Sequence, residues 1–386
     1  MSDKWRIKAL NMKSAYGMQT VGGVITIILL LAGRAFAESS EIKSDGKEMR
    51  ITTQRSLKQY HNTDAKIPDG LDNAIDDTVA FQAALGDGPG IVFVPPGFYR
   101  CGNVNIPSGV MLMGAGPATV IRSNGAKQIF NQRGNNWRMR DLVLDGEAAG
   151  DWQVEMDDPK GGWKTRKDLG CTGLLLRDCS EFQISGIIVR NFSGIGIQIE
   201  RTRRSSYCRW ATQGHIYDVV VSGNYIGLSF DERAEYINAS MLTCQGNVIG
   251  CVINAGNVKI TDSNFTNNKT GMIIEDKDNG SHGSISGCFL NHNELSLLCR
   301  NVKLGMTINN CCFFGAIRIE NSVGVNIVNS IMGSGVTITG EGSNRIAGNY
   351  FVTENSALNV SPSTIVSDNF TQKGARVLAS VKEMPR

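Results

Sequence analysis

The feature that most constrains the fold of this chain is one pattern that recurs three times between Val258 and Asn326. The copies begin at Val258, Gly283 and Met306. Each contains a short apolar strand, an Asn-rich or Gly-containing bend, a second apolar alternation and a polar turn. A repeat of about twenty residues cannot bury its own apolar side, so successive repeats stack as turns of a coil. The pattern predicts an all-β solenoid that carries its function on the outside.

The inward position of each predicted turn can be followed along the chain by its apolar residue. It falls at Ile184, Ile216, Ala239, Ile260, Ile285, Ile308, Ile327, Ile346 and Ile365. An asparagine follows eight residues after four of these markers, at Asn224, Asn247, Asn268 and Asn293. Asn tolerates left-handed backbone, and its amide can bond the Asn of the next turn. We therefore predict a structural asparagine ladder.

The N-terminal residues have the pattern of an export signal. Basic residues precede the apolar run 21–31, and Ala35-Phe-Ala37 forms a cleavage site. The apolar run is shorter than the roughly twenty residues needed to span a bilayer, so stable membrane insertion is not expected. We predict a signal peptide over 1–37, a polar linker over 38–59, a single domain over 60–386 and an exported protein.

Composition narrows the functions and partners to consider. The formal net charge is only +3, so the total gives no sign of nucleic-acid binding. Four histidines leave little material for a His-rich metal site. Ten cysteines in an exported chain raise the question of disulfides. However, Cys288 and Cys311 occupy one inward position of adjacent turns, about 4.8 Å apart, so they are expected to be apolar core residues.

A short helix is predicted before the first strands. Asp76 and Asp77 precede apolar residues at helical spacing, at Val79, Ala80, Ala83 and Ala84. Such a helix would cover the open end of a solenoid. Together with Val92-Phe-Val-Pro-Pro-Gly-Phe-Tyr99 and Gly114-Ala-Gly116, this segment resembles the pectate-lyase-like superfamily. The resemblance implies a right-handed parallel β-helix that acts on carbohydrates, and it also admits a homotrimer, an assembly that several relatives form.

Two segments interrupt the repeat. Residues 145–170 and 201–214 combine aromatic with charged side chains, and insertions in a solenoid emerge as loops, often over the binding face. Either segment could instead be a solvated loop. As candidates for binding a polysaccharide we take Trp152, Trp163, Arg201, Arg203, Arg204, Arg209 and Trp210.

Polar residues follow the second apolar alternation of six successive repeats. They are Glu200, Asp231, Asn254, Glu275, Arg300 and Glu320. In a parallel coil these side chains form a row at about 4.8 Å per turn. Like-charge neighbours raise carboxylate pKa values and would equip one carboxyl group as a general acid. Polar residues at a strand exit are also ordinary turn residues, and the sequence leaves both interpretations open.

The turns beyond this row contain further catalytic candidates. One carries Arg233 and Glu235, and another carries Asp276, Lys277, Asp278, Asn279 and His282. Asp276, Asp278 and Asn279 offer hard oxygen ligands for Ca²⁺. His282 could act as a base beside Lys277, and β-elimination also needs a cation on the uronate carboxylate. Lys277, Arg233, Arg300 or the arginines of 201–209 could supply that cation.

The motifs of particular enzymes are not recognisable. The chain lacks the successive motifs of polygalacturonases, the arginine motif of pectate lyases and the Asp-Pro-His-type motif of alginate epimerases. We expect an exported lyase that acts on an acidic polysaccharide. A glycoside hydrolase or fructan-type transferase using Asp231 with Glu200 or Glu275 is the alternative, and a non-catalytic glycan-binding or structural solenoid is the third hypothesis.

Overall fold

The computed structural model describes residues 76–86, 88–148, 169–201, 213–276, 280–353, 358–377 and 380–381. It also gives the backbone of three short strands before them, β1 (Ile42–Ser44), β2 (Lys47–Met49) and β3 (Gln54–Ser56). Strands β1 and β2 pair antiparallel. Strand β3 lies within the stretch expected to be a linker and pairs in parallel with β4 (Gly90–Phe93).

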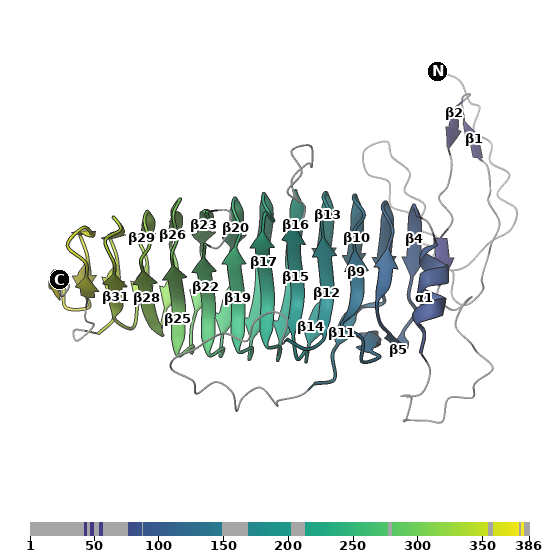
Figure 1. Ribbon diagram of the computed structural model, residues 1–386, viewed down its shortest axis with the longest axis horizontal. Helices are drawn as coiled ribbons and strands as arrows, with labels where there is room; N and C mark the ends of the chain where they lie inside the picture. The colour runs from purple at the N-terminus through teal and green to yellow at the C-terminus, as the bar shows by residue number, and fades with distance from the viewer. Residues whose placement is uncertain are drawn as a thin grey trace, which may run out of the picture. The chain divides into compact units, whose positions relative to one another are not determined.

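The described chain from α1 (Thr78–Leu85) onward is a right-handed parallel β-helix (Figure 1). This confirms the solenoid that the repeat predicted and the β-helix that the family resemblance implied. Each turn has three sides, because two bends and one longer turn separate three strand positions. Sides one and two belong to one 23-stranded sheet, and side three is a separate 12-stranded sheet. The strands pair in parallel with the strands one turn away, which leaves the outer surfaces of the sheets as the available faces.

The strands of side one are β4, β7 (Val110–Met113), β10 (Trp137–Arg140), β13 (Phe182–Ser185), β16 (Gly214–Ser222), β18 (Ile237–Gln245), β20 (Val258–Thr261), β23 (Gly283–Ser286), β26 (Met306–Asn309), β29 (Val325–Val328), β32 (Arg345–Ala347) and β35 (Ile365–Ser367). Strands β16 and β18 continue through the bend onto side two. The remaining strands of side two are β5 (Gly97–Cys101), β8 (Thr119–Ser123), β11 (Val143–Asp145), β14 (Ile188–Arg190), β21 (Asn264–Thr266), β24 (Phe289–Leu290), β27 (Cys312–Phe313), β30 (Ile331–Met332), β33 (Tyr350–Phe351) and β36 (Phe370–Thr371). A short 3-10 helix, η2 (Gly116–Ala118), precedes β8.

Side three carries the functional candidates. Its strands are β6 (Val104–Ile106), β9 (Gln128–Gln132), β12 (Thr172–Arg177), β15 (Ile195–Arg201), β17 (Ile226–Glu232), β19 (Ile249–Asn254), β22 (Thr270–Glu275), β25 (Leu295–Arg300), β28 (Ala316–Glu320), β31 (Val336–Thr339), β34 (Leu358–Val360) and β37 (Ser380–Val381). Gly196 and Gly227 sit near the start of β15 and β17. A Cβ on Gly196 would lie 2.7 Å from the Gly227 carbonyl oxygen, so the close stacking of these strands requires glycine.

The interior is a continuous apolar core, and the inward register matches the sequence markers from Ile184 to Ile346. The last marker is wrong by one residue. Ile346 pairs with Val366, while Ile365 is 58% exposed on the outer face. Burial raises the pKa of the Cys244 thiol to about 12. The cysteines that the structure describes are unbridged, and most pack as small core side chains.

The asparagine ladder is confirmed as a hydrogen-bonded column. The Asn224 side chain donates to Asn247 Oδ1 at 3.0 Å, Asn247 donates to Asn268 at 3.0 Å, and Asn268 donates to Asn293 at 3.2 Å. The left-handed residue, however, is the one before each of these asparagines, such as Asn267 at φ 55° and Gly223 at φ 62°. The column lies at the corner between sides two and three and fixes where each side-three strand starts.

The capping helix α1 covers the first turns of the core. Its N-cap residue is Asp77, and the side chain of the preceding residue, Asp76, accepts the Thr78 N–H through Oδ1 at 2.9 Å. The apolar face differs from the prediction, because Phe81, Ala84 and Leu85 are buried whereas Val79 is 79% exposed. Phe81 packs edge-on against Phe130, with centroids 5.9 Å apart. That contact anchors the helix over the core.

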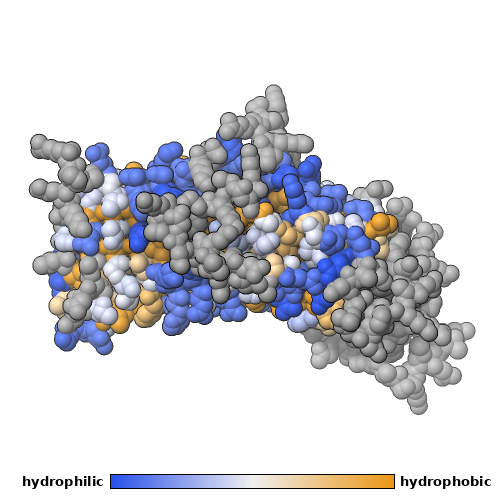
Figure 2. Space-filling view, turned by 60° about the horizontal axis from the view of Figure 1, so that its bottom comes forward, coloured by the Kyte–Doolittle hydropathy of each residue, from blue (hydrophilic) through white to orange (hydrophobic). Residues whose placement is uncertain are grey.

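Figure 2 shows the molecule turned so that the lower side of Figure 1 comes forward. Hydrophilic residues line both edges of this view, and hydrophobic residues are exposed between them. Among the described residues, no helix is long and apolar enough to cross a membrane. The expected export signal lies outside the described residues.

Candidate active site

The predicted polar row exists on the outer face of side three. Glu200 pairs in register with Asp231, Asp231 with Asn254, Glu275 with Arg300, and Arg300 with Glu320. The remaining step follows from Ile253 and Ile274, which pair immediately before Asn254 and Glu275. The row extends one turn further toward the N-terminus, since Arg177 pairs with Glu200. Six sequence candidates therefore lie on one line, parallel to the coil axis.

Two carboxylates in this row are joined by a bridging amide. Gln198 Nε2 donates to Glu200 Oε2 at 3.0 Å and lies 3.4 Å from Asp231 Oδ2. Ser229 Oγ donates to the same Asp231 oxygen at 2.8 Å. The Arg177 Nε–H donates to Glu200 Oε1. These side chains point outward from neighbouring strands, so the network is a feature of the face and not of the core.

The carboxylates are buried although they lie on the outer face. Asp231 is 0% exposed, Glu200 7% and Glu275 6%. Arg300 forms an ion pair with Glu275 at 2.8 Å between Nη2 and Oε2. The row thus mixes both signs of charge, and the charged neighbours of Glu200 and Glu275 include arginines. The sequence predicted carboxylates with neighbours of like charge. In the structure, Glu200 and Glu275 are instead paired with arginines and held in position by them.

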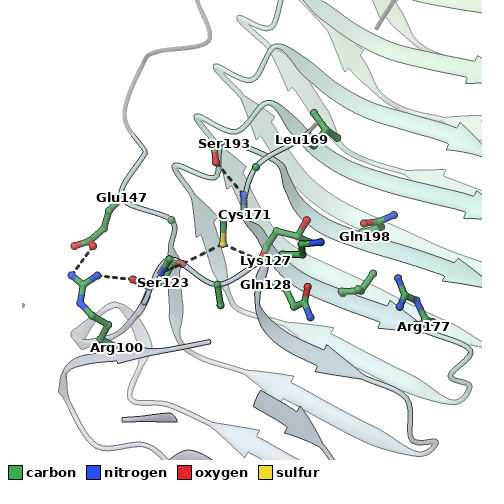
Figure 3. Close-up of a pocket in the computed structure, with 16 residues that line it drawn as sticks. Arg100, Ser123, Lys127, Gln128, Glu147, Leu169, Cys171, Arg177, Ser193 and Gln198 are labelled. Carbon is green, nitrogen blue, oxygen red and sulfur yellow. Dashed lines mark hydrogen bonds and ion pairs between the residues drawn. The ribbon is translucent and has the colours of Figure 1, made fainter. Parts of the chain in front are cut away.

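A cavity of about 650 Å³ opens beside this network (Figure 3). Arg177, Gln198 and Leu175 form its wall on side three, and Lys127 comes from the turn before β9.

The opposite wall of the cavity comes from side two. Arg100 and Glu147 stand there, joined by an ion pair of 2.6 Å (Figure 3). The Cys171 thiol also lines the cavity, 3.2 Å from Ser123 Oγ, and burial raises its pKa. The cavity is therefore lined by cationic side chains, and two of its lining residues, Arg177 and Gln198, hydrogen-bond the Glu200 carboxylate.

An apolar strip lies beside the polar row on the same outer face. It is a buried cluster separate from the core, formed by Ile195, Tyr225, Ile226, Val248, Ile249, Val252, Ile273 and Leu298. Ala148 and Leu169 pack against it. These two residues flank the first insertion, so that insertion leaves and rejoins the described chain at this face. Arg201 and Gln213 flank the second insertion at the opposite edge of side three.

Most candidates in the insertions and in the turn after β22 lie outside the described residues. They are Trp152, Trp163, Arg203, Arg204, Arg209 and Trp210 in the insertions, and Lys277, Asp278 and Asn279 in the turn. Arg201 is described, ends β15 and is buried. The roles of the undescribed residues stay predictions.

The turns after β17 and β22 place several sequence candidates at the edge between sides three and one. Glu235 Oε2 accepts an N–H of Asn257 at 3.3 Å, and Arg233 lies two residues before it. His282 Nδ1 is 2.5 Å from the Gly280 carbonyl oxygen. Because a carbonyl can only accept, Nδ1 carries the proton and Nε2 of the neutral ring keeps its lone pair. His282 can therefore accept a proton.

The proposed calcium site is only partly described. Asp276 Oδ1 accepts the Gly280 N–H at 2.9 Å, and Oδ2 lies 3.8 Å from Lys303 Nζ. Within the described residues, no group of three or more His, Cys, Asp or Glu side chains is arranged to hold a metal ion. Because Asp278 and Asn279 lie outside that part of the chain, calcium binding stays a prediction.

Several residues of the site were missed by the sequence reasoning. Arg177 follows Leu174-Leu-Leu176 in the same way that Glu200 follows its strand, so extending the alignment by one turn would have found it. Gln198 and Ser229 lie two residues before the row on adjacent strands, and the same outward alternation predicts their direction. Arg100 and Lys127 come from distant turns, and no sequence signal indicated them.

The fold and the site define a right-handed parallel β-helix with a row of acidic and cationic side chains on one outer face. The family described as rhamnogalacturonase A/epimerase, pectate lyase-like, matches residues 70–273, which is more than half of the chain. The protein belongs to this family. The superfamily resemblance of the N-terminal segment is thereby confirmed.

One curated relative and two solved structures place the chain among known proteins. Mannuronan C5-epimerase AlgE6 of Azotobacter vinelandii is 30% identical over 190 residues, 43% of this chain and 21% of that protein. The chain thus spans about a fifth of the relative's length. The A-module of the Azotobacter vinelandii mannuronan C-5 epimerase AlgE4 has a TM-score of 0.57 at 18% identity, covering 83% of this chain and 95% of the module.

The second structure is the tailspike gp49 of Acinetobacter baumannii bacteriophage Fri1, a capsular polysaccharide depolymerase. Its TM-score is 0.53 at 14% identity, covering 84% of this chain and 59% of the tailspike. At these identities the two structures establish the β-helix fold alone.

Proposed function

We propose that this protein is an exported polysaccharide-modifying enzyme that acts on an acidic, uronate-containing glycan, and that it works as a lyase. The reaction begins with removal of the proton at C5 of a uronate, next to its carboxylate. The O4 substituent then leaves, and an unsaturated sugar end remains. Such a reaction needs a base at C5, a cation on the uronate carboxylate and a proton donor for the leaving oxygen.

The observation that carries the proposal is the carboxylate pair Glu200 and Asp231, bridged by Gln198. Gln198 itself lines a cavity that also holds cationic side chains. A neutral glycan would not require several cations beside the reacting groups. A uronate carboxylate would be bound by Arg100 or Lys127, which face the cavity from other turns. The charge of the cavity wall therefore favours an anionic sugar.

The proton-transfer roles fall to the buried carboxylates. The Asp231 carboxylate accepts a hydrogen bond from the Ser229 hydroxyl and is fully buried, so its position is fixed. The Arg177 guanidinium orients Glu200 and stabilises its negative charge. We assign Asp231 and Glu200 to proton transfer at C5 and O4, a role that requires glycan binding to expose both carboxylates. His282, with its lone pair on Nε2, is the alternative base on the same edge.

Epimerisation is the second candidate, and the sequence similarity to a mannuronan C5-epimerase favours it. Both reactions share the C5 proton abstraction. They differ afterwards, because an epimerase returns a proton to the opposite face of C5 while a lyase expels the O4 substituent. The same residues could therefore support either outcome, and only the products distinguish them.

The test is an incubation of the purified protein with mannuronan and with polygalacturonate, with and without a chelator. Ultraviolet absorbance of unsaturated ends would support the lyase. An unchanged chain length with inverted C5 configuration would support the epimerase. New reducing ends without unsaturation would replace both with a hydrolase that uses Glu200 and Asp231, which are about 5 Å apart on adjacent strands.

Matched variants assign the reaction to the site. Asp231→Asn and Glu200→Gln keep the side-chain shape and remove the charge, so activity should fall about 10²- to 10⁴-fold if these groups transfer protons. Glu294→Gln alters an exposed carboxylate at the other edge of side three and should leave activity unchanged. If all three variants behave alike, the proposed site is wrong.

A further inference from the structure

A second face of the coil carries an exposed apolar ladder. On side two, Phe289 pairs with Cys312, Cys312 with Ile331, Ile331 with Tyr350, and Tyr350 with Phe370. We call these five residues the apolar ladder. Its four large members are well exposed, Phe289 by 47%, Ile331 by 39%, Tyr350 by 41% and Phe370 by 45%. Five successive turns thus present an outward apolar residue at one position.

A run of this kind is not expected on a solvated sheet. In the two preceding turns the same outward position is polar, at Thr243 and Asn264. Exposed apolar patches of several residues mark interaction sites more often than single exposed side chains do. The ladder therefore needs a partner whose surface is long and apolar.

The border of the ladder toward side one is polar but mostly uncharged. Asn310, Asn329 and Asp368 lie in the bend before Cys312, Ile331 and Phe370, all with positive φ and all exposed. Their amides and carboxylate can bond hydroxyl groups beside the apolar surface. An aromatic platform bordered by hydrogen-bonding groups matches a pyranose ring, which has an apolar C–H face and hydroxyl edges.

The size of the ladder favours a glycan over a second copy of this chain. Each large side chain exposes about 100 Å², so the four together offer about 400 Å². A stable protein interface needs about 800 Å² from each partner. The ladder is also narrow, being widened only by the exposed Phe314 ring two residues after Cys312, and it runs along the coil axis with about 4.8 Å between turns. A single polysaccharide chain has that shape.

We propose that the apolar ladder is a second, non-catalytic binding surface for a polysaccharide chain, recognised through the C–H faces of its sugar rings. It lies on side two, while the carboxylate row lies on side three, so the two surfaces are separate. Binding at the ladder does not depend on the reaction assigned to the row. In the lower-side view, hydrophobic residues are exposed between hydrophilic borders toward the C-terminal end (Figure 2).

The test is affinity electrophoresis of the full chain through gels that contain mannuronan, polygalacturonate or a neutral β-1,4-glucan. All proteins carry Asp231→Asn, so that turnover does not erode the gel. Tyr350→Ala with Phe370→Ala should weaken retardation about tenfold. Val79→Ala, an exposed apolar residue on α1, is the matched control and should retain full binding.

Two further measurements keep the outcome decisive. Sedimentation should give the same oligomeric state for the parent protein and for the Tyr350→Ala, Phe370→Ala variant. If the parent self-associates and the variant does not, the ladder is an interface between copies and the proposal is overturned. In saturation-transfer nuclear magnetic resonance, irradiation of the aromatic protons of the protein with an unmutated ladder should pass saturation to the C–H protons of the bound sugar. Equal retardation of the variant and the control, with no transfer of saturation to the sugar, also overturns the proposal. Loss of the reaction assigned to side three, with glycan binding at the ladder intact, would overturn only the proposed function.

Discussion

Replacing Asn247 by alanine tests the element that positions side three. The Asn247 side chain makes four hydrogen bonds within the ladder of asparagines. Its Oδ1 accepts from Asn224 N at 2.9 Å and from Asn224 Nδ2 at 3.0 Å, and its Nδ2 donates to Val221 O at 3.1 Å and to Asn268 Oδ1 at 3.0 Å. All four are buried, so water cannot replace them without cost.

The magnitude follows from those contacts. A buried hydrogen bond contributes about 1 kcal/mol net, so Asn247→Ala should lower the free energy of unfolding by about 3 to 4 kcal/mol. Asn238→Ala is the matched control, because Asn238 is exposed on side one, and it should change stability by less than about 0.5 kcal/mol.

Urea denaturation followed by circular dichroism measures both variants. The account predicts a clear shift of the midpoint for Asn247→Ala and almost none for Asn238→Ala. A loss below about 1 kcal/mol at Asn247, or an equal loss in both variants, would show that the asparagine ladder does not hold the corner together.

Three further outcomes are expected. Arg177→Leu removes the partner of the buried Glu200 carboxylate, so activity should fall strongly while Arg177→Lys restores part of it, as steady-state kinetics would show. Burial raises the pKa of Tyr99 to about 12, above its unfolded value of about 10. The protonated phenol is thus favoured by folding, so stability should fall as pH rises between those values, and Tyr99→Phe should flatten that part of a pH titration. Burial also raises the pKa of Cys171, so its alkylation should be slower than that of free cysteine at about pH 8.5 and should accelerate as pH rises.

The solenoid and its register could be predicted because they depend on a repeated local pattern. The markers from Ile184 to Ile346 share one inward position, and a shift of one residue would turn the whole strand inside out. The last turn was misassigned because Ile365 and Val366 are both apolar, so hydrophobicity alone cannot decide which faces inward. Val79 was misassigned for a similar reason, since the short helix buries the face that carries Phe81.

The row of side three was predictable from strand ends, but its chemistry was not. Alignment brings Glu200 and Asp231 together, whereas the bridging role of Gln198 depends on side-chain geometry. The cavity could not be predicted, because Arg100 and Lys127 reach it from turns that are distant in sequence. Contacts of this kind depend on packing across the coil and leave no local pattern.

The measurement that tests the central claim most directly is proton exchange at C5. The protein is incubated with mannuronan in deuterated water, and the products are analysed by nuclear magnetic resonance. The account predicts that wild-type protein yields unsaturated ends or deuterium at C5, and that Asp231→Asn and Glu200→Gln lose this signal while Glu294→Gln retains it. Chain cleavage without unsaturation or deuterium, or an unchanged signal in the Asp231 and Glu200 variants, would contradict it.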